Sequence, residues 1–112
     1  MSIAPEGEES ILVVLTTVGT AEEATRIAHQ LVERRLAACV NVLPAIRSVF
    51  RWEGAVQEET EHLLLTKTTR ARFEAVSACI RELHSYDVPE IVAVPAAAVD
   101  GAYAAWLRDS VA

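Results

Sequence analysis

The segment from His84 to Glu90 places an imidazole, a phenol and two carboxylates within one short stretch. Its polar character is typical of a loop between a helix and a strand, and loops at the ends of elements often carry function. A neutral imidazole is the commonest ligand of transition metals, so His84 and the thiol of Cys39 are candidate donors for a soft or borderline metal such as copper. The alternative is a hydrogen-bonded turn with a structural role, and sequence spacing does not decide whether His84 and Cys39 meet.

A second polar group runs from Glu58 to His62, within a segment that we expect to be a strand. Alternation sends Glu59 and Glu61 to one face and Glu58 to the other. If the strand pairs with the one before it, Arg47 lies diagonal to Glu58, which predicts a cross-strand salt bridge. The alternative is a carboxylate-lined site for a divalent cation, which needs several oxygens to converge.

Composition excludes several functions. The net charge of -6 argues against a nucleic-acid partner, because binding to a phosphate backbone depends on a basic surface. No run approaches the roughly 18 apolar residues that cross a bilayer, so we expect no membrane partner and a cytoplasmic location. The chain has only 4 scattered glycines and no glycine-flanked serine at a sharp turn. Neither a phosphate loop nor a Ser-His-Asp hydrolase is therefore expected, and we assign no catalytic residue.

The elements that must position these residues follow from periodicity. Residues 1–10 are expected to be a disordered tail, and residues 11–112 a single domain. Thr20 and Glu23 have the spacing of a capping box at the start of a helix. The predicted elements are a central strand at 11–15, a helix at 21–35, strands at 36–52 and 55–68, a helix at 73–84, an edge strand at 90–95 and a short helix capped by Asp100 with Tyr103, Trp106 and Leu107 on one face.

This order predicts an α+β domain with the ferredoxin-like split βαβ arrangement and one added helix. Right-handed crossovers place both main helices on one face of the antiparallel sheet and leave the other face bare. The hairpin around Glu53-Gly54 extends roughly 50 Å, whereas a sixteen-residue helix covers about 24 Å. Its outer half carries the apolar residues Ile46, Val49, Phe50 and Trp52. Both features predict a homo-oligomer, since large exposed apolar patches usually mark interfaces.

Five short motifs together make the chain resemble the divalent-cation tolerance family, CutA. The resemblance spans about Ile11 to Leu107. The motifs are Leu36-Ala37-Ala38-Cys39-Val40-Asn41, Trp52-Glu53-Gly54, Leu65-Thr66-Lys67-Thr68, His84-Ser85-Tyr86 with Pro89-Glu90-Ile91, and Tyr103 with Trp106-Leu107.

The resemblance implies a ferredoxin-like subunit in a tight homotrimer, as in the PII-type signalling trimers. Members are linked to tolerance of copper and other divalent ions, are cytoplasmic in bacteria and have no established catalytic activity. Matched position by position, the family's recurrent residues are expected beside a cleft between subunits. They are Cys39, Trp52, Lys67, His84, Tyr86 and Glu90, with Phe50 where an aromatic residue is usual.

For the ligands, the resemblance divides these residues into two sets. Cys39 and His84 are the candidate metal ligands, and Phe50, Trp52, Lys67, Tyr86 and Glu90 are the candidate ligand-binding residues. Copper-binding members also use a cysteine and a second histidine at the positions held here by Thr16 and Leu83. Copper or another divalent cation would therefore be weakly bound, because metal affinity needs several placed donors.

Three hypotheses remain open. The first is a non-enzymatic trimer that binds a metal ion or a small anionic ligand in its clefts. The second is an enzyme in which His84 acts as a general base with Glu59 or Glu90 as its partner. The third is a structural or signalling trimer in which Lys67 pairs with a glutamate across the subunit boundary.

Overall fold

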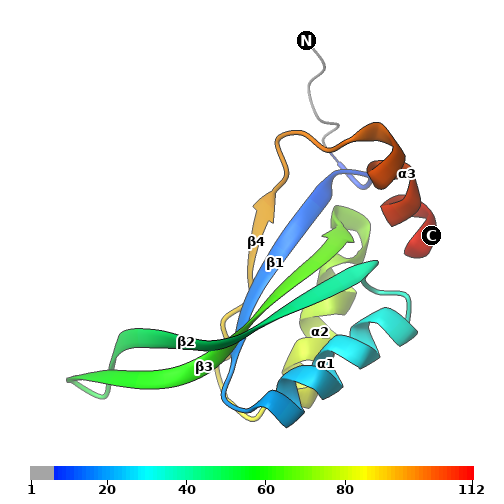
Figure 1. Ribbon diagram of the computed structural model, residues 1–112. Coiled ribbons are helices and arrows are strands. Elements are labelled where there is room, and N and C mark those ends of the chain that lie inside the picture. The colour runs from blue at the N-terminus through cyan, green and yellow to red at the C-terminus, as the bar shows by residue number, and fades with distance from the viewer. Residues whose placement is uncertain (1–6) are drawn as a thin grey trace.

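The computed structural model describes residues 7–112, which fold into a mixed α+β domain with a four-stranded antiparallel sheet (Figure 1). The strands are joined in the order β2-β3-β1-β4, which confirms that the first strand is central and the last strand lies at an edge. The elements are β1 Ile11–Val18, α1 Ala21–Glu33, β2 Cys39–Trp52, β3 Ala55–Thr69, a 3₁₀ turn at Arg70–Arg72, α2 Phe73–Leu83, β4 Val92–Pro95 and α3 Gly101–Ser110.

Every expected helix and strand is present, and the differences lie at the element ends. Helix α1 ends at Glu33 rather than at Arg35, because Arg35 has a left-handed φ of 59° that cannot continue a helix. Strand β4 begins at Val92, so Glu90 lies in the preceding loop and outside the strand predicted for it. Strand β1 runs three residues past Leu15, and β2 begins at Cys39 rather than at Leu36. These shifts at element ends leave the topology unchanged.

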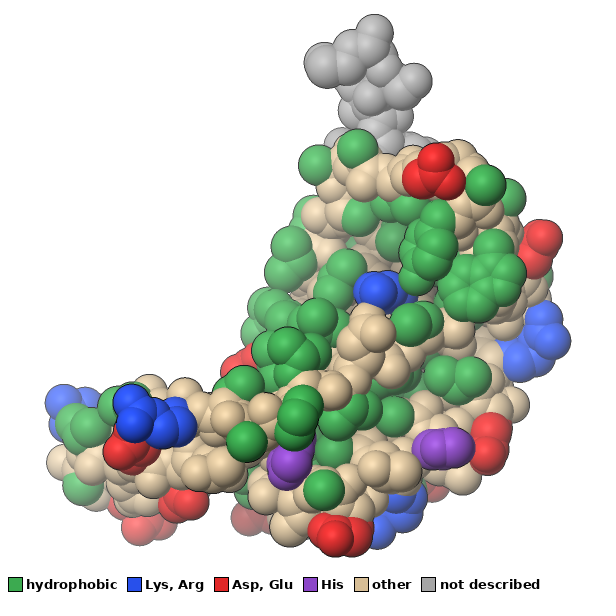
Figure 2. Space-filling model, viewed as in Figure 1, with side chains coloured by type: hydrophobic (Ala, Val, Ile, Leu, Met, Phe, Trp, Pro, Cys, Tyr) green, Lys and Arg blue, Asp and Glu red, His purple; other side chains and the backbone are tan. Residues whose placement is uncertain are grey.

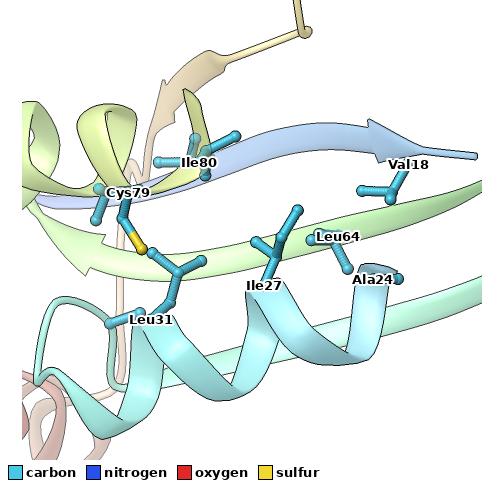
Figure 3. Packing of buried hydrophobic residues seen from close by; sticks show 10 residues of the cluster. Val18, Ala24, Ile27, Leu31, Leu64, Cys79 and Ile80 are labelled. Atoms are coloured by element: carbon cyan, nitrogen blue, oxygen red, sulfur yellow. The ribbon is translucent and has the colours of Figure 1, made fainter. Parts of the chain in front are cut away.

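Helices α1 and α2 cover one face of the sheet and form the main core with it (Figure 3). Alternate residues of the central strands point into this core, among them Val14, Val18 and Leu64, which are fully buried. Ile27 and Leu31 of α1 meet them at helical spacing. Cys79 of α2 is buried in the same cluster, as expected of a small apolar residue.

The opposite face of the sheet is largely uncovered (Figure 2). Val13 and Leu15 of β1 are only partly buried there, and Val92 of β4 is 50 % exposed. A single chain therefore covers β1 fully only on the face toward the helices. Apolar side chains dominate this open face, with basic side chains few among them (Figure 2).

Helix α3 packs against one end of the sheet through a second, smaller core. Asp100 caps it as predicted, since its Oδ2 accepts a hydrogen bond from the Tyr103 amide over 3.2 Å. Leu107 is fully buried, whereas Tyr103 and Trp106 are exposed. Of the three residues predicted to lie on one face, only Leu107 therefore reaches the core. The stripe that α3 buries instead consists of Ala104, Leu107 and, just past the helix, Val111.

The β2–β3 hairpin extends well beyond the helices, and the long axis of the domain measures 46 Å (Figure 1). Trp52 pairs with Ala55 across a two-residue turn, as predicted. Both turn residues have positive φ, 49° at Glu53 and 79° at Gly54, which matches the right-handed twist of the strands. We call residues 46–61 of this hairpin the arm.

A β-bulge interrupts β2 where the arm begins. Pro44 and Ala45 together lie opposite the single residue between Glu61 and Leu63, and Ala45 has a left-handed φ of 56°. The extra residue reverses the alternation of β2, so Ile46 and Phe50 lie on the same side as Leu63. The apolar side of the arm is thus continuous with the open face of the sheet.

The expected tail over residues 1–10 lies mostly outside the described residues, which begin at Gly7. Gly7 to Ser10 form a turn closed by the Ser10 amide, which donates to the Gly7 carbonyl over 3.1 Å. Ser10 is buried, and its carbonyl accepts a hydrogen bond from the Arg70 amide. Order therefore begins before Ile11. No helix within residues 7–112 is long and apolar enough to span a membrane.

Candidate functional site

The imidazole of His84 is held at the end of α2, where the ring is buried against β1. Its Nε2 lies 2.7 Å from the Thr17 carbonyl oxygen, and its Nδ1 accepts a hydrogen bond of 3.1 Å from the Tyr86 amide. A carbonyl only accepts and an amide N–H only donates, so this pattern requires the neutral tautomer with its proton on Nε2. Both ring nitrogens are thus already engaged within the chain.

Glu23 closes this site from the first turn of α1. Its carboxylate accepts hydrogen bonds from the Ser85 amide and, over 3.0 Å, from the Ser85 hydroxyl. Its Oε1 also lies 3.9 Å from Nδ1 of His84. Half of the predicted capping box is present, because Thr20 Oγ1 accepts from the Glu23 amide. The carboxylate reaches the loop instead of the helix start, so Glu23 anchors the loop that carries His84 and Tyr86.

Tyr86 completes the cluster by reaching across the end of β1 to β3. Its hydroxyl donates to Glu61 Oε2 over 2.9 Å, and Glu61 is 5 % exposed. Burial, this hydrogen bond and the nearby carboxylates of Glu59 and Glu23 raise the pKa of Tyr86 to about 12. The ring passes over Gly19, where an added Cβ would lie 3.2 Å from the Tyr86 hydroxyl oxygen. A glycine at this position leaves room for the contact.

Lys67 lies on the open face, in a different environment. It pairs across the strands with Cys39 of β2 and Val13 of β1. Its Nζ is 6.0 Å from the centre of the Tyr103 ring, and this ring packs at a tilt against Trp106. The only lysine of the chain thus stands among aromatic and apolar groups.

A single chain brings neither of the two predicted sets of site residues together. Lys67 and Cys39 lie level with Val13, whereas His84 bonds to Thr17, four residues further along β1. Four strand residues span about 13 Å. In a single chain, Cys39 and His84 are thus too far apart to share one metal ion.

The remaining predicted ligand-binding residues are divided between two more places. Phe50 and Trp52 lie near the tip of the arm and are exposed, Trp52 to 53 %. Glu90 is exposed in the loop before β4 and, like Glu59, forms no hydrogen bond or ion pair with His84 in the part of the chain that the structure describes. The carboxylate nearest to the imidazole is that of Glu23, which sequence reasoning placed only in a helix cap.

The second polar group forms the predicted salt bridge, with Arg47 Nε 3.4 Å from Glu58 Oε1. Arg47 also lies opposite Thr60, as the turn required. Among residues 7–112, no cluster of three or more His, Cys, Asp or Glu side chains could hold a metal ion. Within one chain, the donors that the structure describes therefore do not form a strong metal site.

Sequence reasoning missed Glu23 and Glu61, the two buried carboxylates that hold the loop. Both are buried although glutamate is seldom buried without a partner. Sequence spacing does not predict their contacts, since Glu23 lies 62 positions before Ser85 and Glu61 lies 25 positions before Tyr86. Glu61 occupies a strand position that alternation assigns to the open face, and only the loop that folds over the end of β1 buries it.

Comparison with known proteins gives consistent matches over nearly the whole chain. A model of the CutA1 divalent ion tolerance protein family matches residues 12–110. The divalent-cation tolerance protein CutA of Thermus thermophilus is 50 % identical over 98 residues, which cover 88 % of this chain and 95 % of the relative. The chloroplastic protein CutA of Arabidopsis thaliana is 40 % identical over 99 residues, and the matched part is 54 % of its length.

Solved structures show the same likeness. The divalent cation tolerance protein Cut A1 from Thermus thermophilus superimposes with a TM-score of 0.89 at 48 % identity, covering 91 % of this chain and 99 % of that one. CutA from Synechococcus elongatus gives the same TM-score at 37 % identity, covering 99 % of this chain and 96 % of that one.

Proposed function

This chain belongs to the CutA1 divalent ion tolerance family, and on that premise we propose that it is a non-enzymatic, cytoplasmic homotrimer that binds a metal ion or a small anionic ligand weakly in clefts between its subunits. Each subunit is ferredoxin-like, with the long hairpin as the main assembly element. Divalent-cation tolerance is the function after which the family is named, and that name describes no catalytic activity.

The observation that carries this proposal is the continuous apolar surface formed by the open sheet face and the arm. Val92, Phe50 and Trp52 are exposed on it, and Leu63 and Leu65 are only partly covered. Monomeric proteins seldom leave so large an apolar surface in water. Burial against copies of the same chain removes it, and a head-to-tail contact that closes on itself gives a ring. The number three rests on the family resemblance.

The separation of the candidate residues supports clefts between subunits. Lys67 lies about 13 Å along β1 from the level of His84 and Tyr86, and Phe50 and Trp52 lie still further away on the arm. An arm that lies along a neighbouring copy brings its aromatic residues to that copy's sheet. An anion there meets the ammonium group of Lys67 and an apolar wall, which is the usual composition of a small-ligand site.

Metal binding in this proposal is weak and also needs more than one copy. Cys39 of one subunit and His84 of another are the donors, because one chain keeps them apart. His84 must release the Tyr86 amide or the Thr17 carbonyl before a ring nitrogen can coordinate. That release opposes coordination, and the two further donor positions hold Thr16 and Leu83.

One observation favours the alternative of a purely structural or signalling trimer. His84, Tyr86 and Glu23 satisfy one another within the chain, so their chemistry is used to fix the loop. Enzyme action through His84 with Glu59 or Glu90 gains no such support, because neither carboxylate orients the imidazole.

Two measurements test the proposal. Sedimentation equilibrium should give three times the subunit mass at micromolar protein, and a monomer would contradict the assembly. Titration calorimetry of the assembled protein with Cu(II), Cu(I) and a panel of carboxylates and phosphates should give heat with micromolar or weaker affinity. Lys67→Ala should lose the anion response, whereas Arg81→Ala, a change of an exposed basic residue on α2, should not. If no ligand gives heat, the structural alternative remains.

A further inference from the structure

Lys67 has no counter-charge among the residues that the structure describes. Among residues 7–112 no carboxylate lies within ion-pair distance of its ammonium group. Its surroundings are the Tyr103 ring, Cys39 and Val13, and its side chain is already partly buried. In a single chain, water still reaches the open face and solvates the charge.

Association would change this situation. A copy that covers the open face removes water from Lys67, and desolvation of an ammonium ion costs several kcal/mol unless an anion replaces the lost hydration. The Tyr103 ring offsets only a small part of that cost. The covering surface must therefore carry an anion to the level of Val13 on the sheet. The chain has 16 acidic and 10 basic residues, so an unpaired carboxylate is the most abundant source.

Of the four carboxylates on the arm, Glu53 lies in the tip turn outside the strand pairing, and one of the other three suits this purpose. Glu58 is paired with Arg47, and Glu61 accepts the hydroxyl of Tyr86. Glu59 is exposed, and the hydrogen bonds and ion pairs of the described residues do not include it. It lies opposite Ser48, on the side of the arm that is continuous with the open face.

Strand geometry excludes a contact within one chain. Glu59 and Lys67 are eight residues apart on β3 and share one face, which separates them by about 26 Å.

We propose that Glu59 on the arm of one copy forms an ion pair with Lys67 on the open face of the next. The proposal rests on the assembly proposed above and names the contact that sets its direction, and a small anionic ligand binds Lys67 only by displacing Glu59. Residue 59 of one copy meets residue 67 of the next, and so on around the ring, which is a heterologous contact. The apolar surface drives association, and the charge pair selects the position of the arm along the partner's sheet.

Charge exchange tests the pair directly. Lys67→Glu and Glu59→Lys should each weaken assembly by about 30-fold or more, measured as the protein concentration of half-dissociation by sedimentation. The double variant should recover to within about tenfold of wild type, because it restores opposite charges. Glu58→Lys is the matched control. Glu58 is next to Glu59 in the sequence, but it lies on the other face of the arm and pairs with Arg47. It should change the midpoint by less than about threefold.

A chemical measurement guards against variants that fail to fold. Lys67 is the only lysine, so acylation by a water-soluble ester, followed by mass spectrometry of the peptide containing it, reports on one side chain. In the assembled protein it should react at least about tenfold more slowly than in Glu59→Gln at the same assembly state.

The outcomes separate the two proposals. A wild-type monomer overturns the assembly. A wild-type trimer in which Glu59→Lys assembles normally, or in which the double exchange is no better than either single change, overturns the ion pair alone. Rescue of Lys67→Glu by Glu90→Lys instead of Glu59→Lys would assign the partner to the loop before β4. A midpoint that depends on added phosphate would assign it to a dissolved anion.

Discussion

Loss of the Glu23 carboxylate should destabilise the protein far more than loss of its neighbour Glu22. In Glu23→Ala, the Ser85 amide and hydroxyl lose a charged acceptor, and hydrogen bonds to charged groups contribute about 1.5–3 kcal/mol each. Ser85 is exposed, so water replaces part of this loss. We therefore expect a decrease of about 3 kcal/mol in the free energy of unfolding, at the low end of the sum.

Glu22→Ala is the matched control, because Glu22 lies in the same first turn of α1 and is exposed. It loses only its favourable interaction with the helix dipole, about 0.5 kcal/mol. Urea unfolding followed by circular dichroism measures both changes, at one fixed subunit concentration because the proposed assembly would make stability concentration-dependent. Equal decreases in the two variants would refute the reasoning, because they would show that the bonds to Ser85 contribute nothing beyond a surface charge.

Two more predictions concern Tyr86 and the hairpin turn. The pKa of Tyr86 in the folded state, about 12, lies above the usual value near 10. The contribution of the neutral Tyr86 side chain to the free energy of unfolding is therefore complete below about pH 10 and is lost as the pH rises to 12. The stability advantage of wild type over Tyr86→Phe should therefore shrink from pH 10 to 12 in urea titrations, and a constant difference would contradict this origin of the pKa shift. Gly54→Ala should cost about 1 kcal/mol in thermal or urea unfolding, because φ is 79° at Gly54. Gly101 lies in the first turn of α3 without a positive φ, so Gly101→Ala should leave stability unchanged or raise it slightly. Equal losses of stability in the two variants would show that the positive φ at Gly54 is not the cause.

The fold was predictable because its signals are local. The turn at Glu53-Gly54 sets the register, and from that register the contact between Arg47 and Glu58 follows correctly. Helical and strand periods gave the order of the elements, and right-handed crossovers then left one topology.

The bulge was not predictable from alternation. Pro44 indicates an irregular strand, but nothing in the local sequence shows that Ala45 takes a left-handed φ. That single residue lets Leu43 and Ile46, which are three positions apart, lie on the same side of the hairpin. Strand partners counted back from the turn are correct as far as Ile46. For the residues of β2 that precede the bulge, they are wrong by one position.

The candidate site was predicted only in part, because its contacts join distant segments. His84 and Tyr86 were identified from their residue types, but Glu23 was assigned to a helix cap and Glu61 to a strand face. Burial of these carboxylates depends on where a loop folds, and residue spacing contains no information on that. The distance between Lys67 and His84 likewise appears only once the strands are paired.

The extra residue at Pro44 and Ala45 joins two stretches of β2 whose registers already agree. An in-frame deletion of either codon would leave Leu43 opposite Leu63 and Ile46 opposite Glu61, so every side chain of the arm would keep its side. The deletion would instead remove the bend and the added twist that a bulge gives to a hairpin. A change of one codon thus alters the direction in which the arm leaves the sheet and not the face that it presents.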